Sequence, residues 1–132
     1  MQNGLYIVAT PIGNLGDLSP RAAETLANAD VIACEDTRIA KKLFALLNIS
    51  TAGKKFIVYQ NYNEEDEAQN LINLAVNDGK SIALVSDAGS PLISDPGYKL
   101  VRKAREQNVF VTVLPGCCAL ICALQLPGLS TN

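Results

Sequence analysis

The sequence of 132 residues contains no histidine and no tryptophan. Without histidine, the chain cannot supply a Ser-His-Asp triad, a Cys-His pair, an H-E-x-x-H metal site or a histidine ligand to haem. Any chemistry must therefore use carboxylates, lysines, hydroxyls, thiols or backbone amides.

The chain also lacks an excess of positive charge and any long apolar run. Its formal net charge is −2, from 11 Lys and Arg against 13 Asp and Glu, so a polyanion would have to meet a local basic patch. No apolar run approaches the roughly 18 residues that cross a bilayer. The segment that follows Met1 has no basic region, apolar core or cleavage site of a signal peptide. We expect a cytoplasmic protein without membrane association.

Cysteine is present but in no metal-binding or redox spacing. The four cysteines are Cys34, Cys117, Cys118 and Cys122. The adjacent pair does not match a C-x-x-C motif, and thiols stay reduced in the cytosol. We therefore predict reduced, mostly buried thiols and no metal site.

Short apolar runs alternate with helical patterns, and both fit into a single domain covering residues 1–132. The helical patterns carry start signals such as Ser19-Pro20, Asn63 before acidic residues and Asp95-Pro96. A further helix is expected from about residue 117 to 125. The predicted strands are 5–9, 31–34, 56–59, 82–85 and 109–114. This alternation predicts an α/β fold with a five-stranded, mostly parallel, doubly wound sheet flanked by helices.

Ligands of such sheets bind beyond the carboxyl ends of the strands, where this sequence places its polar and glycine-rich segments. Segment 10–17 contains two glycines and a proline, which permit close backbone approach to a ligand. It matches neither G-x-G-x-x-G nor a Walker A loop, so a plain tight turn remains the alternative.

Two carboxylates and a cation follow the second predicted strand. Glu35 or Asp36 is a candidate proton acceptor, and Arg38 is a candidate anchor for phosphate. The structural alternative is a helix N-terminus that favours acidic residues.

The segment after the fourth predicted strand is the richest in functional groups. Residues 86–98 include two aspartates, three serines, two glycines and two prolines, a composition typical of a functional loop. After the fifth strand, Pro115-Gly116 leads into small residues whose backbone amides could receive a polar ligand group.

Taken together, these segments resemble the N-terminal domain of the tetrapyrrole methylase superfamily of S-adenosylmethionine-dependent methyltransferases. The motifs that carry the resemblance are LYIVATPIGNLGD (5–17), ACEDTR (33–38), ALVSDAGSPLISDPGYKLV (83–101) and the Pro115-Gly116 turn. They are most similar to the branch that methylates the ribose 2′-hydroxyl of a cytidine in 16S ribosomal RNA. The resemblance implies S-adenosyl-L-methionine as cofactor, 16S ribosomal RNA as partner, a homodimer, and a second, C-terminal domain that this chain lacks.

The resemblance also implies which positions border the cofactor. These positions are Pro11, Ser86, Asp87, Ala88, Ser90, Cys118 and Ala119. Cys117-Cys118 departs from the Pro-Ser pair that is typical there, so a contact through a hydroxyl is replaced by a weaker thiol partner. Asp87 is an alternative candidate for the base.

Two basic clusters offer local contacts for RNA. One contains Arg38, Lys41 and Lys42, and the other contains Lys99, Arg102, Lys103 and Arg105. The second also matches an ordinary solvated helix face. Two other functions stay open: a methyltransferase acting on a tetrapyrrole or another small molecule, and a nucleotide-binding or dimerisation module without chemistry.

Overall fold

The strands form one sheet in which every pairing is parallel. In the computed structural model, residues 1–9, 18–59, 64–86 and 95–114 are described. The strands are β1 (Gly4–Ala9), β2 (Val31–Cys34), β3 (Lys55–Val58), β4 (Ser81–Ser86) and β5 (Val111–Leu114). Their order across the sheet is β3-β2-β4-β1-β5. The predicted α/β class and parallel sheet are confirmed.

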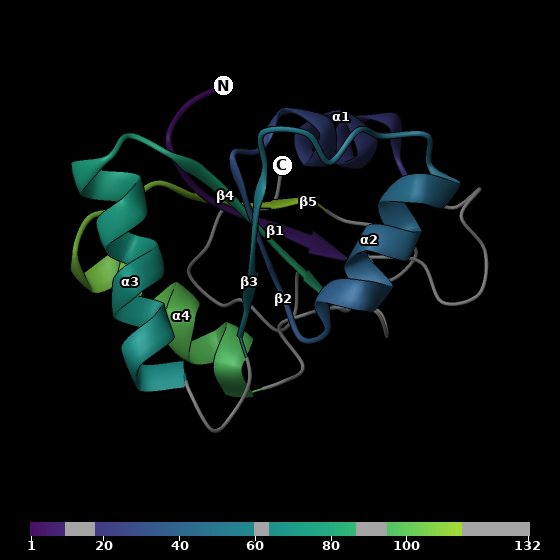
Figure 1. Cartoon of the computed structure of the whole chain (residues 1–132). Coiled ribbons are helices and arrows are strands. Elements are labelled where there is room, and N and C mark those ends of the chain that lie inside the picture. The colour runs from purple at the N-terminus through teal and green to yellow at the C-terminus, as the bar shows by residue number, and fades with distance from the viewer. Residues whose placement is uncertain (10–17, 60–63, 87–94, 115–132) are drawn as a thin grey trace.

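Helices cover both faces of this sheet. The helices are α1 (Pro20–Asn28), α2 (Thr37–Leu46), α3 (Glu64–Asn77) and α4 (Asp95–Glu106). Figure 1 shows α1 and α2 on one face and α3 and α4 on the other. The strand order explains this division, because β1 to β3 progress toward one edge while the later crossovers run toward the other. Since such crossovers are right-handed, reversing their direction changes the face that the helices cover.

Each face has its own apolar core. Leu26 of α1 and Phe44 of α2 are fully buried against side chains of the central strands such as Ile32. On the other face, Leu71 of α3 and Leu100 of α4 are fully buried. The central strands are therefore apolar on both sides, as the sequence pattern predicted.

The helix ends follow their local sequence signals. Ser19 caps α1, because its Oγ accepts a hydrogen bond from the Ala22 backbone N–H at 3.1 Å, and Pro20 occupies the first turn. Gly79 takes a positive φ of 65° just after α3 ends. The predicted cap at Asn63 and the predicted helix after residue 116 lie outside the described residues.

Strand β5 begins two residues later than the sequence predicted. The Val109 backbone N–H donates to the Ala104 carbonyl at 2.8 Å, and Asn108 has a left-handed φ of 59°. Val109 therefore belongs to the termination of α4, although its side chain packs against the apolar core. None of the helices in the described parts of the chain has the length and hydropathy that crossing a membrane requires.

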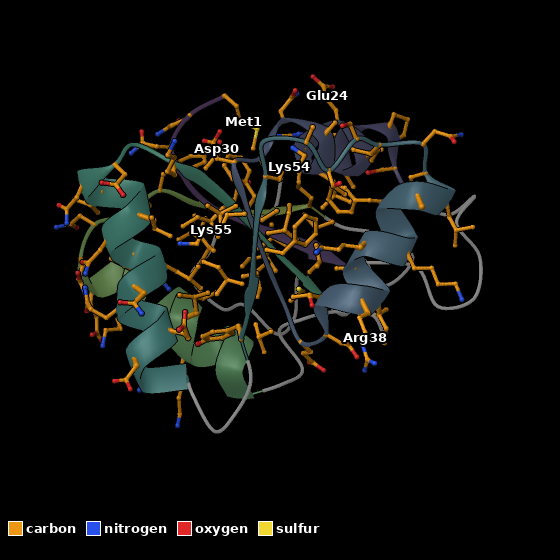
Figure 2. The ribbon with its side chains drawn as sticks, in the orientation of Figure 1. Met1, Glu24, Asp30, Arg38, Lys54 and Lys55 are labelled. Atoms are coloured by element: carbon orange, nitrogen blue, oxygen red, sulfur yellow. The ribbon has the colours of Figure 1, made fainter. Side chains whose placement is uncertain are left out.

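Polar ties close the amino edge of the sheet. Asp30 Oδ2 accepts hydrogen bonds from the Ser81 backbone N–H at 3.0 Å and from Ser81 Oγ at 3.2 Å. Lys54 Nζ donates to the carbonyls of Ala27 and Ala29 at 2.6 and 2.7 Å, where α1 ends. Figure 2 shows Asp30 and Lys54 near each other at this edge. These contacts fix the starts of β2 and β4 and satisfy carbonyls that a helix end leaves without partners.

The Asp30 tie makes a testable contribution to stability. The pKa of Asp30 is lowered from 3.8, chiefly by the hydrogen bond from the Ser81 backbone, against a smaller opposing effect of burial. A lowered pKa means that the tie stabilises the fold above pH 4 and that this stabilisation is lost as the pH falls through the folded-state pKa. We expect Asp30→Ala to reduce the free energy of unfolding at pH 7 by about 1 kcal/mol.

Urea unfolding at pH 7 and at pH 3 measures this effect. The difference between the wild type and Asp30→Ala should shrink at pH 3. Glu24→Ala is the matched control, because Glu24 is an exposed acidic residue within α1. An Asp30→Ala variant as stable as the control variant at pH 7 would contradict the assignment.

Candidate functional site

The carboxyl edge of the sheet brings together strand ends that are far apart in the sequence. Ser86, the last residue of β4, pairs with Ala9, the last residue of β1. On its other side β4 pairs with β2, with Ala33 opposite Leu84, so the continued register places Glu35 level with Ser86. Neighbouring strands are about 4.8 Å apart. The backbone of Ser86 thus lies between the end of β1 and the segment that contains the candidate carboxylates.

This edge also contains the topological switch point of the sheet. Neighbouring strands β1 and β4 lead to helices on opposite faces, α1 after β1 and α4 after β4. Chains that diverge in this way leave room for a ligand between them, which is why open α/β sheets bind ligands there. The sequence placed its candidate residues at the carboxyl ends of the strands, and those in the described ranges do lie there.

Asp36 caps helix α2. Its Oδ1 accepts a hydrogen bond from the Arg38 backbone N–H at 2.9 Å. The Arg38 guanidinium approaches the same carboxylate, with Nε 3.5 Å from Oδ1 and Nη2 3.3 Å from Oδ2. The Arg38 side chain is 89% exposed and that of Asp36 is 31% exposed, so solvent screens this pair.

These contacts determine the ionisation of Asp36. Its pKa lies below 3.8, because the Arg38 side chain and then the Arg38 backbone donate hydrogen bonds to the charged form. Asp36 is therefore ionised at neutral pH, but a carboxylate with a lowered pKa is a weaker proton acceptor. The sequence analysis also allowed a purely structural role for this segment, as a helix N-terminus that favours acidic residues. Asp36 occupies such a position.

Glu35 and Arg38 are presented differently. Glu35 directly follows β2 and is exposed. Arg38 lies in the first turn of α2, and Figure 2 shows its side chain projecting outward at the end of the helix opposite the Asp30 edge. A cation in this position can reach a phosphate group and still contact Asp36.

One of the two lysines in the first basic cluster has a packing role that the sequence did not reveal. Lys41 Nζ lies 5.3 Å from the centroid of the Phe56 ring, a distance that favours a cation–π contact. Phe56 in turn makes an edge-to-face contact with the buried Phe44, with 5.4 Å between ring centroids. Lys41 and Lys42 are both exposed to solvent, and Lys41 also contacts Phe56 of β3.

The remaining predicted cofactor positions are not placed by the structure. Pro11, Asp87, Ala88, Ser90, Cys118 and Ala119 lie outside the described residues. Of Ser86, the backbone position at the end of β4 is described. The roles assigned to these residues, and to Glu35, Asp36 and Arg38, stay predictions.

Solved structures with the same fold include tetrapyrrole-modifying enzymes. Uroporphyrin-III-C-methyltransferase from Thermus thermophilus matches 96% of this chain with a TM-score of 0.66 at 24% sequence identity. The cobalamin biosynthetic enzyme cobalt precorrin-4 methyltransferase matches 97% of the chain with a TM-score of 0.68 at 18% identity. This chain corresponds to 55% and 54% of those two chains. At these identities the similarity supports the fold alone.

Relatives by sequence are much closer. Ribosomal RNA small subunit methyltransferase I of Vibrio cholerae is 54% identical over 97% of this chain, and that of Rickettsia prowazekii is 47% identical over all of it. The chain spans 43% and 46% of the length of these two relatives. The family model for Tetrapyrrole (Corrin/Porphyrin) Methylases matches residues 4–132. The resemblance inferred from the loop motifs is confirmed, and this chain belongs to the tetrapyrrole methylase family.

Proposed function

We propose that this chain is the N-terminal part of an S-adenosylmethionine-dependent methyltransferase that methylates the ribose 2′-hydroxyl of a cytidine in 16S ribosomal RNA. The observation that carries the proposal is the 54% identity with the Vibrio cholerae ribosomal RNA small subunit methyltransferase I over 97% of this chain. Identity with the tetrapyrrole-modifying enzymes of the same fold is 18–24%. A ribosomal RNA substrate is therefore better supported than a tetrapyrrole substrate.

The complete enzyme of this proposal includes a second, C-terminal domain and acts in the cytoplasm as a homodimer. Support for the second domain comes from length, because the matched relatives are more than twice as long as the part that this chain covers. The cofactor then lies between the carboxyl edge of this sheet and the second domain. Cytoplasmic location follows from a ribosomal RNA substrate.

The described part of the carboxyl edge suits S-adenosylmethionine. When bound, this cofactor supplies a methyl group activated by a sulfonium cation. The ends of β1 and β4 lie side by side at the switch point, where nucleotide-like ligands of such sheets bind. The negative charge of the Glu35 and Asp36 carboxylates would attract the positively charged sulfonium of the cofactor.

The residues of this chain have two tasks in the proposed reaction. They hold the ribose oxygen in line with the methyl carbon, and they accept the proton that the 2′-hydroxyl loses as the new carbon–oxygen bond forms. Arg38 can hold a neighbouring phosphate with its planar guanidinium. Of the two candidate proton acceptors, Asp36 is weakened by its hydrogen bonds from Arg38 and by its lowered pKa, so Glu35 is the candidate to test first.

Substitutions that separate the two carboxylates test this assignment. We expect Glu35→Gln to slow methyl transfer by at least about 100-fold, the effect typical of losing a general base. Asp36→Ser should keep most of the activity, because serine also accepts a hydrogen bond at an N-cap. Asp36→Ala should lower the melting temperature by a few degrees, because α2 then loses its cap. The measurements are transfer of tritium from labelled S-adenosylmethionine to 16S RNA, and thermal unfolding of each variant.

Two outcomes would count against the proposal. If Glu35→Gln and Asp36→Ala both methylate at the wild-type rate, neither carboxylate is the base, and Asp87 becomes the next candidate. If the wild-type enzyme transfers tritium to a tetrapyrrole but not to 16S RNA, the proposed substrate is wrong.

A second experiment distinguishes an enzyme half from a self-sufficient binding module. We expect calorimetry to show much weaker binding of S-adenosylmethionine to this chain alone than to the complete enzyme, because the second domain supplies part of the site. Thermal unfolding of the isolated chain is the control that it is folded during the titration. Equal affinity in both would indicate that this domain binds the cofactor without the second one.

A further inference from the structure

Helices α3 and α4 enclose a groove on the face of the sheet that is opposite to α2. The groove has a volume of about 440 Å³. Figure 1 shows the two helices side by side on that face. The residues that line it, here called the α4 groove, are Ala68, Gln69, Lys99, Arg102, Lys103, Glu106 and Gln107.

The α4 groove is positively charged in a chain whose net charge is negative. Of the lining residues that the structure describes, three are cations and one, Glu106, is an anion, while the whole chain carries a formal charge of −2. A fourth cation, Arg105, is exposed on the same helix. The local charge is thus of the sign that attracts a polyanion, although the total charge is not.

Part of the positive charge of helix α4 is not paired with a carboxylate within the part of the chain that the structure describes. There, neither Arg102, Lys103 nor Arg105 forms an ion pair. Glu67, in the acidic first turns of α3, borders a separate groove next to β3 together with Lys55. A ligand anion would therefore not have to displace a carboxylate from Arg102 or Lys103.

Neutral amides complete the groove. Gln107 Nε2 donates to Gln69 Oε1 at 3.1 Å, Gln69 Nε2 approaches Gln107 Oε1 at 3.5 Å, and Gln69 Nε2 also donates to Asn73 Oδ1 at 2.9 Å. This reciprocal pair links α3 to the end of α4, while Ala68 is buried below it. The side chains of Arg102 and Lys103 therefore extend from a helix, α4, whose end is tied to its neighbour α3.

The composition of the groove indicates the kind of contact that it makes. Among the residues whose side chains the structure describes, its lining contains no aromatic side chain on which a base could stack and no large apolar side chain that could enter a membrane. Arginine, lysine and glutamine are the residues that contact phosphate and sugar in nucleic acids, and such contacts position the strand without reading its sequence. Helix α4 begins at the carboxyl edge of the sheet, the edge at which the candidate carboxylates also lie.

We propose that the α4 groove binds the phosphodiester backbone of the RNA substrate through Arg102 and Lys103. This inference rests on the proposed function for the identity of the polyanion. It adds a second RNA contact, on the face of the sheet opposite to α2, to the one expected at Arg38.

The test is the salt dependence of RNA binding by the complete enzyme. The double variant Arg102→Gln/Lys103→Gln removes both charges but keeps aliphatic stems and good helix formers. We expect the slope of the logarithm of affinity for a 16S RNA fragment against the logarithm of salt concentration to decrease in magnitude by about 1.5, as for two lost phosphate contacts. The KM for RNA should rise, while kcat at saturating RNA and the melting temperature stay at the wild-type values.

Two further double variants serve as controls. Lys55→Gln/Lys80→Gln removes the same charge from exposed lysines at the starts of β3 and β4, at the other edge of the sheet, and should leave the slope unchanged. Arg102→Lys/Lys103→Arg keeps the charge and should preserve the slope. An unchanged slope in Arg102→Gln/Lys103→Gln, or an equal decrease in the Lys55→Gln/Lys80→Gln control, would overturn the proposal.

The activity of the wild-type enzyme separates this proposal from the proposed function. If the wild type methylates 16S RNA but the slope does not depend on Arg102 and Lys103, the α4 groove proposal alone is wrong. If the wild type binds RNA with a slope that depends on these residues but methylates another substrate, the proposed function alone is wrong. Failure of the wild type to bind RNA would overturn both.

Discussion

The parallel pairing of β4 between β1 and β2 is the constraint on which the rest of this domain depends. Strands β1 and β2 are consecutive in the sequence but are not neighbours in the sheet. The connection between them skips one strand position, and β4 occupies that position. Reversal of direction after β3 then places the later helices on the opposite face, since crossovers keep one hand. The two apolar cores and the switch point at the carboxyl edge all follow from this one insertion.

The amino and carboxyl edges of the sheet differ in the contacts that their polar side chains make. At the amino edge, Asp30 and Ser81 bond to each other where β2 and β4 begin side by side, and Lys54 satisfies the carbonyls at the end of α1. These groups hold the strands in register and have little left to offer a ligand. At the carboxyl edge, Glu35 and Arg38 are exposed to solvent, and the proposed function assigns binding and proton transfer to side chains at this edge.

Much of the fold could be predicted because the residues that determine it act locally. Apolar runs such as residues 31–34 and start signals such as Ser19-Pro20 are contained within a few positions of the sequence. The start of the first strand was predicted wrongly because it depends on a contact with a segment that is distant in the sequence. The sequence prediction began the first strand at Leu5, but β1 starts at Gly4, where an added Cβ would lie 2.6 Å from the Phe110 carbonyl oxygen of another segment. No pattern in residues 1–9 reveals that contact.

For the candidate site, the location could be predicted from the sequence, but the contacts between its side chains could not. Its location followed from the rule that parallel sheets bind ligands at their carboxyl ends, and the family motifs supplied residue types. The engagement of Asp36 could not be predicted, because it depends on where the Arg38 guanidinium lies relative to that carboxylate. Similarly, the packing of Lys41 on Phe56 joins residues that are close only after β3 has paired with β2.

The absence of histidine takes its meaning from this geometry. A proton acceptor for a hydroxyl near neutral pH is most often histidine, whose ordinary pKa is close to 6.5. A carboxylate is a weaker base, but methyl transfer from a sulfonium does not require complete deprotonation before attack, because the hydroxyl proton becomes acidic as the new bond forms. Under this demand a carboxylate whose pKa is lowered by a hydrogen-bonded cation, as that of Asp36 is, is a weaker candidate for the base. The Arg38 contact therefore gives Asp36 a structural task, because Asp36 caps the start of α2 and holds the guanidinium beside it, while a carboxylate remains the proton acceptor that the proposed reaction requires.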